Sequence, residues 1–303
     1  MRVLIVGLPY FAKRVHADLS AFDTDNTYFV LDTYENWFDK LKTLFLLPNV
    51  DLIYSINGSI SHSLVFSLAM KLRKKLVMHW VGTDVVKSRL SFKNGDYNQS
   101  FITGATHLCE VDWIQEELKE IGVHAEVINF ANFEVKQLND SKKLKPSFYV
   151  LAYVANHRPA YYGMEKIIEL ANLLPQTQFK IAGLETFKNI PDNIELLGWV
   201  NNMDELIRDS GMCLRCTEHD GLSSFVLEAL AAGKIVAYNN DFPHCLYTPD
   251  MNSLVGSIKN IEEKHRLGGP EYNKPGREFI ELKFSKVYIL STLRDKLMST
   301  ANG

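Results

Sequence analysis

The chain has 303 residues, of which 46% are hydrophobic and 23% charged, and its formal net charge is −3. This length is expected to hold two domains, and the weakly acidic balance gives no reason to expect nucleic acid as a partner. No apolar run approaches the roughly 20 residues that span a bilayer. The opening MRVLIVGLPYF is too short and too strand-like for a signal peptide, so a cytoplasmic protein is expected.

Strand-like apolar runs alternate with helix-like segments through the first half of the chain. The predicted strands are RVLIVG, TYFVLD, DLIYSI, LVMHWVG, THLCEV and AEVINFA, and the predicted helices lie near residues 12–22, 35–47, 61–74 and 112–121. Such alternation predicts right-handed βαβ units and a parallel sheet. The polar segment 136–146, which ends in proline, is the best linker and closes a first domain of residues 1–140.

The same alternation of strands and helices predicts a second domain, residues 147–303. Its predicted strands are FYVLAYVA, FKIAGL, IELLGWV, MCLRCT and IVAYNN, with helices near 164–174, 203–210, 224–232 and 277–297. The sequence therefore predicts an α/β protein of two Rossmann-like, doubly wound domains that face a central cleft. Ligands of such sheets bind at the carboxyl ends of the strands.

The segment 215–240, RCTEHDGLSSFVLEALAAGKIVAYNN, carries the most specific pattern. A strand leads through a turn at Asp220 into a helix, and Glu228 lies eight residues later, inside that helix. Backbone N–H groups at a helix start favour an anion. Here that start is formed by Gly221, Leu222, Ser223 and Ser224. A phosphate on these amides, with a carboxylate on either side to hold hydroxyls, describes a nucleotide-sugar site.

This segment resembles the donor-site signature of the retaining glycosyltransferases of family 4, which has a Glu, seven residues, a second Glu and a small-residue turn. Asp220 stands in place of the first Glu, and Glu228 matches the second and is followed by ALAAG. The resemblance implies the GT-B fold, with donor binding in the second domain and a last helix that packs back on the first. The alternative is an ordinary buried βαβ unit that carries one Glu.

The resemblance also suggests how the donor is held. Arg158 is a replacement cation for the diphosphate, because Tyr162 stands where the family has Lys, and Arg215 is the rival candidate. The loop LLGWVNN looks like the family's base-binding loop, although it could equally be a simple turn with its tryptophan in the core. Gly198 would let the chain turn closely, and the amide and carbonyl groups of Trp199 and Val200 would contact the base.

In the first domain, LVMHWVGTD resembles the family's strand that ends in a histidine facing the donor sugar. His79 is thus predicted to be catalytic together with Asp220 and Glu228, although a lone histidine is more often a satisfied structural residue. The acceptor side is expected to include Gly7, Pro9, Tyr10, Thr83 and Asp84.

Two other motifs are weak. Cys213 and Cys216 form C-x-x-C inside a strand-like run with no second pair, so we interpret them as core cysteines. Asp23-Thr24-Asp25 matches the D-x-D metal signature of a different glycosyltransferase fold, but it falls in a loop where Asp favours turns. No catalytic metal and no cofactor are expected.

The predicted function is sugar transfer with retention from a nucleotide-diphosphate sugar, most favourably a UDP-sugar, in cell-surface glycan or glycolipid synthesis. A sugar-nucleotide epimerase or a non-catalytic partner subunit is the alternative. The acceptor is a glycan or lipid-linked hydroxyl. Lys71–Lys75 and the aromatic segment Asn36–Pro48 would fit peripheral contact with the inner face of a membrane, or else a solvated helix end and a core helix.

Overall fold

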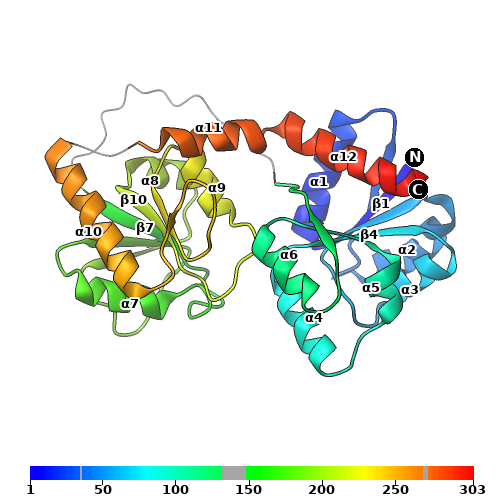
Figure 1. Cartoon of the computed structure of the whole chain (residues 1–303), viewed down its shortest axis with the longest axis horizontal. Helices are drawn as coiled ribbons and strands as arrows, with labels where there is room; N and C mark the ends of the chain where they lie inside the picture. Colours follow the sequence, from blue (N-terminus) through cyan, green and yellow to red (C-terminus); the bar gives the residue numbers. More distant parts are fainter. Residues whose placement is uncertain (35, 132–147, 269–271) are drawn as a thin grey trace. The chain divides into compact units, whose positions relative to one another are not determined.

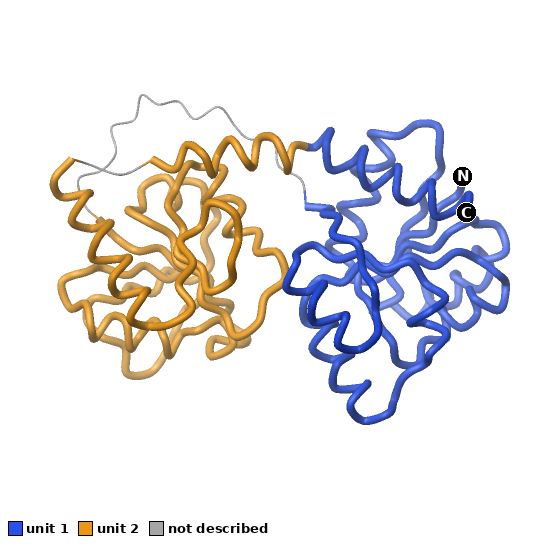
Figure 2. The backbone as a smooth tube through the Cα atoms, viewed as in Figure 1, with its two compact units in different colours: residues 1–132, 286–303 blue, residues 133–285 orange. Residues whose placement is uncertain are grey.

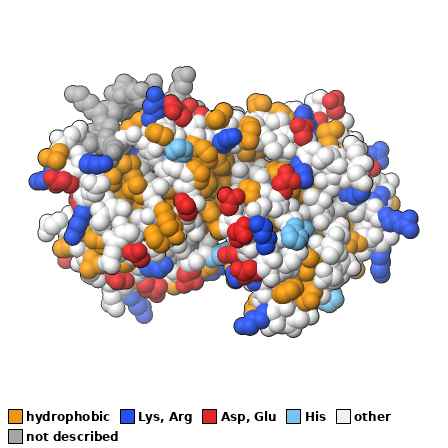
Figure 3. All heavy atoms as spheres, in the orientation of Figure 1, with side chains coloured by type: hydrophobic (Ala, Val, Ile, Leu, Met, Phe, Trp, Pro, Cys, Tyr) orange, Lys and Arg blue, Asp and Glu red, His pale blue; other side chains and the backbone are white. Residues whose placement is uncertain are grey.

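The computed structural model describes residues 1–34, 36–131, 148–268 and 272–303 (Figure 1). The chain divides into two compact units: unit 1 is Met1–Asn132 with Lys286–Gly303, and unit 2 is Phe133–Ser285 (Figure 2). The linker predicted at 136–146 lies outside the described residues. The face drawn in Figure 3 mixes acidic and basic side chains, in keeping with the small net charge.

Unit 1 is built on one parallel sheet in the order β2-β1-β3-β4-β5-β6. Its strands are β1 (Arg2–Gly7), β2 (Thr27–Val30), β3 (Leu52–Ile56), β4 (Lys75–Trp80), β5 (Thr106–Cys109) and β6 (Ala125–Val127). Its helices are α1 (Pro9–Phe22), α2 (Trp37–Leu46), the 3₁₀ helix η1 (Leu47–Asn49), α3 (Leu64–Lys71), α4 (Thr83–Lys93), α5 (Gln99–Gly104), α6 (Asp112–Lys119) and α12 (Lys286–Asn302). The inner strands β1, β3, β4 and β5 are buried over nearly their whole length, because both faces of a parallel sheet are covered.

Unit 2 repeats this plan with a sheet in the order β12-β11-β10-β7-β8-β9. Its strands are β7 (Tyr149–Tyr153), β8 (Gln178–Ala182), β9 (Ile194–Gly198), β10 (Met212–Arg215), β11 (Val236–Tyr238) and β12 (Leu246–Tyr247). Its helices are α7 (Met164–Leu173), α8 (Met203–Asp209), α9 (Ser224–Ala231), α10 (Met251–Gly268) and α11 (Lys274–Lys283). The prediction of two doubly wound α/β domains is confirmed.

The single last helix predicted at 277–297 is wrong, because two helices occupy this part of the chain. The break falls at Phe284, which is buried and packs with the rings of Phe242 and Phe279 at centroid distances of 6.5 and 5.8 Å. Beyond the break, Leu290 and Leu293 of α12 enter the core of unit 1. The last helix therefore completes unit 1.

Each sheet has a point at which the chain reverses its direction of winding. In unit 2 the chain runs outward from β7 to β9 and then returns to β10 on the other side of β7. The carboxyl ends of β7 and β10 thus border a switch point, which is where ligands bind in open parallel sheets. In unit 1 the corresponding ends are those of β1 and β3.

None of the helices in the described ranges has both the length and the apolar character that crossing a membrane requires.

Candidate functional site

The loops that follow β7 and β10 meet at the switch point of unit 2. Gly163 begins α7 with φ +81°, and a Cβ there would lie 2.3 Å from the Cys216 carbonyl oxygen. The backbone N–H of Glu218 donates to the Tyr161 carbonyl oxygen at 2.9 Å. Only glycine allows so close an approach at positive φ. Gly163 therefore lets the loop after β7 pack directly against the loop after β10.

Arg215 and Asp220 form a buried ion pair at this point. Arg215 Nε and Nη2 donate to the two carboxylate oxygens of Asp220 at 2.7 and 2.9 Å, and the side chains are only 8% and 13% exposed. Tyr238 lies opposite Arg215 in the register of β10 and β11, and its hydroxyl donates to Asp220 at 3.3 Å. This two-pronged pairing of guanidinium and carboxylate is a strong charge-assisted contact.

Tyr162 lies beside this pair, at the sequence position where the family signature has a lysine. The Arg215 guanidinium lies over the Tyr162 ring at 5.1 Å from its centroid. Burial would lower the pKa of Arg215, but the Asp220 carboxylate outweighs burial, and the guanidinium stays charged. The sequence pattern predicts that Asp220 and Arg215 both lie at the donor site. It does not predict that their side chains bind each other.

Arg158 is placed differently. It is exposed in the loop after β7, and its guanidinium stacks over the Tyr161 ring at 4.5 Å. Of the two candidate cations, Arg158 is therefore the one whose charged group reaches the surface of unit 2, whereas Arg215 is held inside by Asp220.

The start of α9 lies directly after Asp220. Ser223 is the N-cap residue, is buried and makes no side-chain capping bond, and the next residue, Ser224, is exposed. The first amides of a helix have no acceptor within the helix and carry the positive end of its dipole. Glu228 is half-buried one turn further on. Asp220 and Gly221–Ser224 thus lie at the start of α9, and Glu228 lies on its second turn.

The predicted base-binding loop follows β9 at the same edge of the sheet. Gly198 has φ +62°, its N–H donates to the Leu184 carbonyl oxygen at 3.1 Å, and its own carbonyl accepts from the Gly183 N–H at 2.7 Å. Trp199 is 77% exposed, so the alternative that it packs in the core is wrong. Val200, the next residue, is half-buried.

His79 lies inside unit 1 and has no exposed surface. Its Nδ1 shares a hydrogen bond of 2.7 Å with the Tyr54 hydroxyl, and its ring stands edge-on to Phe130 at 5.0 Å. Burial lowers the pKa of His79 to about 3, so the ring is neutral near pH 7. Its Nε2 is buried as well.

Of the predicted acceptor-side residues, Asp84 has a clear structural task. Its buried carboxylate accepts hydrogen bonds from the backbone N–H groups of Gly58, Val81, Gly82 and Val85 at 2.7–3.2 Å. Burial raises the pKa of Asp84 despite these donors. The carboxylate ties the loops after β3 and β4 together, and the neighbouring Thr83 is exposed.

The other acceptor-side residues lie at the carboxyl end of β1, at the switch point of unit 1. Gly7 has φ +107°, and a Cβ there would lie 2.2 Å from the Ile56 carbonyl oxygen, so this turn needs glycine. Pro9 begins α1, and the side chain of Tyr10 is 69% exposed.

The two weak motifs have structural explanations. Cys213 and Cys216 are buried free thiols, and burial raises their pKa values to about 12 and about 11, as expected of core cysteines. Asp23 makes a turn in which it accepts from the Tyr28 hydroxyl and from the Asn26 amide at 2.7 and 2.8 Å. Within the described ranges no cluster of His, Cys, Asp or Glu has the arrangement of a metal site.

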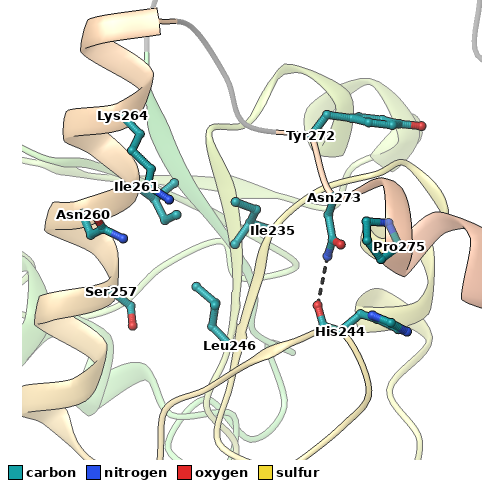
Figure 4. Close-up of a pocket in the computed structure, with 10 residues that line it drawn as sticks. All are labelled: Ile235, His244, Leu246, Ser257, Asn260, Ile261, Lys264, Tyr272, Asn273 and Pro275. Carbon is teal, nitrogen blue, oxygen red and sulfur yellow. Dashed lines mark hydrogen bonds between the residues drawn. The ribbon is translucent and has the colours of Figure 1, made fainter.

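Unit 2 also contains a cavity of about 350 Å³ (Figure 4). Its lining includes Ile235, which precedes β11, and Asn273, whose amide donates to the His244 carbonyl oxygen at 2.9 Å. Since β10 and β11 are parallel, this cavity borders the amino end of β11, whereas Asp220 follows the carboxyl end of β10. The cavity is therefore separate from the cluster around α9.

No protein-family model matches the sequence, and no curated protein matches it significantly. Solved structures do match. Alr3699/HepE of Anabaena, in complex with UDP-glucose, gives a TM-score of 0.70 at 14% identity and covers 99% of this chain and 100% of its own. Sucrose-phosphate synthase of Thermosynechococcus elongatus gives 0.69 at 13% identity and covers 99% of both chains. WaaG, a glycosyltransferase involved in lipopolysaccharide biosynthesis, gives 0.61 at 12% identity and covers 98% of this chain and 99% of its own.

These are GT-B glycosyltransferases of the family-4 type, and the likeness extends over the whole chain. At such low identity the likeness establishes architecture alone. The two six-stranded parallel sheets with flanking helices give this chain the GT-B fold.

Proposed function

We propose that the chain transfers a sugar from a nucleoside-diphosphate sugar, a UDP-sugar above all, to an acceptor hydroxyl with retention of configuration. The observation that carries the proposal is the position of α9: its N-terminus and Asp220 follow β10 at the switch point of unit 2, and Glu228 comes on the second turn of the helix. Structures of the same fold hold UDP-glucose in one case and UDP with GlcNAc in another.

In this proposal the diphosphate binds the amides of Gly221–Ser224. The exposed guanidinium of Arg158 supplies the cation, because the charge of Arg215 is engaged by Asp220. Gly198 makes the turn, and the backbone of Trp199 and Val200 contacts the base. Glu228 holds the ribose hydroxyls, and Asp220, fixed by Arg215, presents its carboxylate to a sugar hydroxyl.

The chemistry requires stabilisation of a departing diphosphate more than it requires a nucleophilic side chain. As the bond from the anomeric carbon to the phosphate oxygen breaks, the amides and the cation neutralise the charge that develops on that oxygen. The acceptor oxygen bonds to the same face of the carbon, and its proton passes to the departing oxygen. A catalytic role for His79 stays a prediction. Because the ring is buried and neutral near pH 7, it supplies no positive charge to a ligand.

Isothermal titration calorimetry with UDP tests the donor site. We expect Glu228→Ala to weaken binding by about 2–4 kcal/mol, the range for removing a charged hydrogen-bond partner. Glu169→Ala is the matched control, since Glu169 is an exposed carboxylate on α7 of the same unit. Equal affinities of folded Glu228→Ala and the control would contradict the assignment. Turnover is then measured with a panel of nucleotide sugars, with and without glycan and lipid-linked acceptors.

A non-catalytic subunit is the second candidate, and the engagement of Arg215 with Asp220 favours it, because one candidate cation is thereby withdrawn from the diphosphate. It predicts no binding of UDP or of nucleotide sugars, and no turnover on any acceptor. Interconversion of the sugar without transfer would instead identify an epimerase.

A further inference from the structure

Helix α2 of unit 1 presents its apolar side to solvent. Trp37, Phe38, Leu41 and Phe45 are 57%, 61%, 42% and 78% exposed. Successive helical residues are about 100° apart, so these four side chains fall within an arc of about 100°. A helix that merely covers a sheet buries such an arc. Here the buried residue is instead the polar Thr43.

The polar side of α2 holds the helix in place. Asn36 caps its start and accepts from the Phe38 N–H at 3.0 Å, and Asp39 accepts from the Asp32 N–H at 3.1 Å. At the other end, Lys74 Nζ donates to the Pro48 carbonyl oxygen at 3.0 Å. The helix is thus formed and anchored through polar contacts, and its apolar arc is left facing outward.

Basic residues surround the apolar arc. Lys40 and Lys42 lie on its two flanks, as the helical spacing requires. The bond from Lys74 to Pro48 links the basic segment 71–75 to η1, which directly follows α2, and α2 lies beside α3 (Figure 1). Segments 36–49 and 71–75 together contain six basic residues and one acidic residue, whereas the whole chain has a net charge of −3.

We propose that this surface, α2 with the basic segment 71–75, docks unit 1 on an anionic lipid bilayer. Aromatic and aliphatic side chains on one side of a helix, flanked by lysines, fit a helix that lies in the plane of the interface with its apolar side about 5–10 Å deep. Tryptophan favours this region because its ring is amphipathic. Charge complementarity selects an anionic surface, since each basic residue near such a surface raises partitioning about fivefold.

Sedimentation of the full chain with sucrose-loaded vesicles tests the proposal. We expect binding to phosphatidylcholine vesicles that contain phosphatidylglycerol, and little to phosphatidylcholine alone. Phe45→Glu should lower the partition coefficient at least about tenfold, and Lys71→Gln about fivefold. Leu90→Glu is the matched control, because Leu90 is 60% exposed on α4 of the same unit; it should change binding less than about twofold.

Trp37 offers a direct readout of depth. Its fluorescence should shift to the blue on anionic vesicles, and Trp37→Phe should abolish the shift. No binding to anionic vesicles, or equal losses in Phe45→Glu and Leu90→Glu, would overturn the proposal. So would a monomer–dimer equilibrium without lipid that Phe45→Glu abolishes, because a second copy would then cover the arc. Nucleotide sugar is absent throughout, so this result is independent of donor binding.

Discussion

The buried pair of Arg215 and Asp220 makes a quantitative prediction for Asp220→Asn. Removing one partner of a buried ion pair costs about 3–5 kcal/mol, because the other charge is left uncompensated. Asn keeps one oxygen for the guanidinium, and the Asp220 side chain is 13% exposed, so we expect about 2–3 kcal/mol. For a unit of this size that loss lowers Tm by roughly 4–12 °C.

A double-mutant cycle separates the pair from its surroundings. The unfolding of wild type, Asp220→Asn, Arg215→Met and the double variant is followed by circular dichroism. We expect a coupling of about 2 kcal/mol. Glu263→Gln serves as control, since the Glu263–Arg266 pair is 50% and 73% exposed and should contribute less than about 1 kcal/mol. A coupling below about 0.5 kcal/mol would refute the argument and make Arg215 available to a diphosphate.

Three further outcomes are expected. The buried neutral His79 contributes stability that is fully present above its unfolded pKa of about 6.5 and is lost as the pH falls toward the folded pKa of about 3. Between pH 6.5 and 5, wild type should therefore lose about 1–2 kcal/mol more than His79→Leu in denaturant unfolding. Sugar transfer should keep its rate in excess EDTA. If EDTA abolishes the rate and Mn²⁺ restores it, Asp23 is a candidate metal ligand. Gly163→Ala should cost about 3 kcal/mol, whereas Gly95→Ala, at φ +73° in open space, should cost only about 1 kcal/mol in the same unfolding assay.

The alternation of strands and helices was predictable because each strand is a short apolar run, and the start of α9 was predictable from Asp220, Gly221 and the two serines. Helices α4, α5 and α10 and the short strand β12 escaped prediction. In α4 the polar Asp84 and Ser88 are buried beside Val85, whereas Val86 and Leu90 are exposed, so its apolar residues do not form one buried face. A helix of this kind is fixed by tertiary contacts and not by periodicity.

The site was predicted as a set of residues but not as an arrangement. Arg215 and Asp220 are five residues apart around a turn, and nothing local says that their side chains bind each other. The pairing depends on β11, whose register places Tyr238 opposite Arg215 and its hydroxyl near Asp220. Likewise the burial of His79 depends on Tyr54 and Phe130, which come from distant segments.

The return of α12 to unit 1 has a consequence for biosynthesis. The core of unit 1 contains Leu290, Leu293 and Leu297 of α12 together with Val15 and Leu19 of α1. This core is therefore complete only when residues near the C-terminal end of the sequence have been added. During translation, residues 1–132 leave the ribosome more than 150 residues before this helix, with an apolar groove uncovered. A fragment made for expression should therefore join residues 286–303 to residues 1–132 through a short linker; one cut at 132 should aggregate.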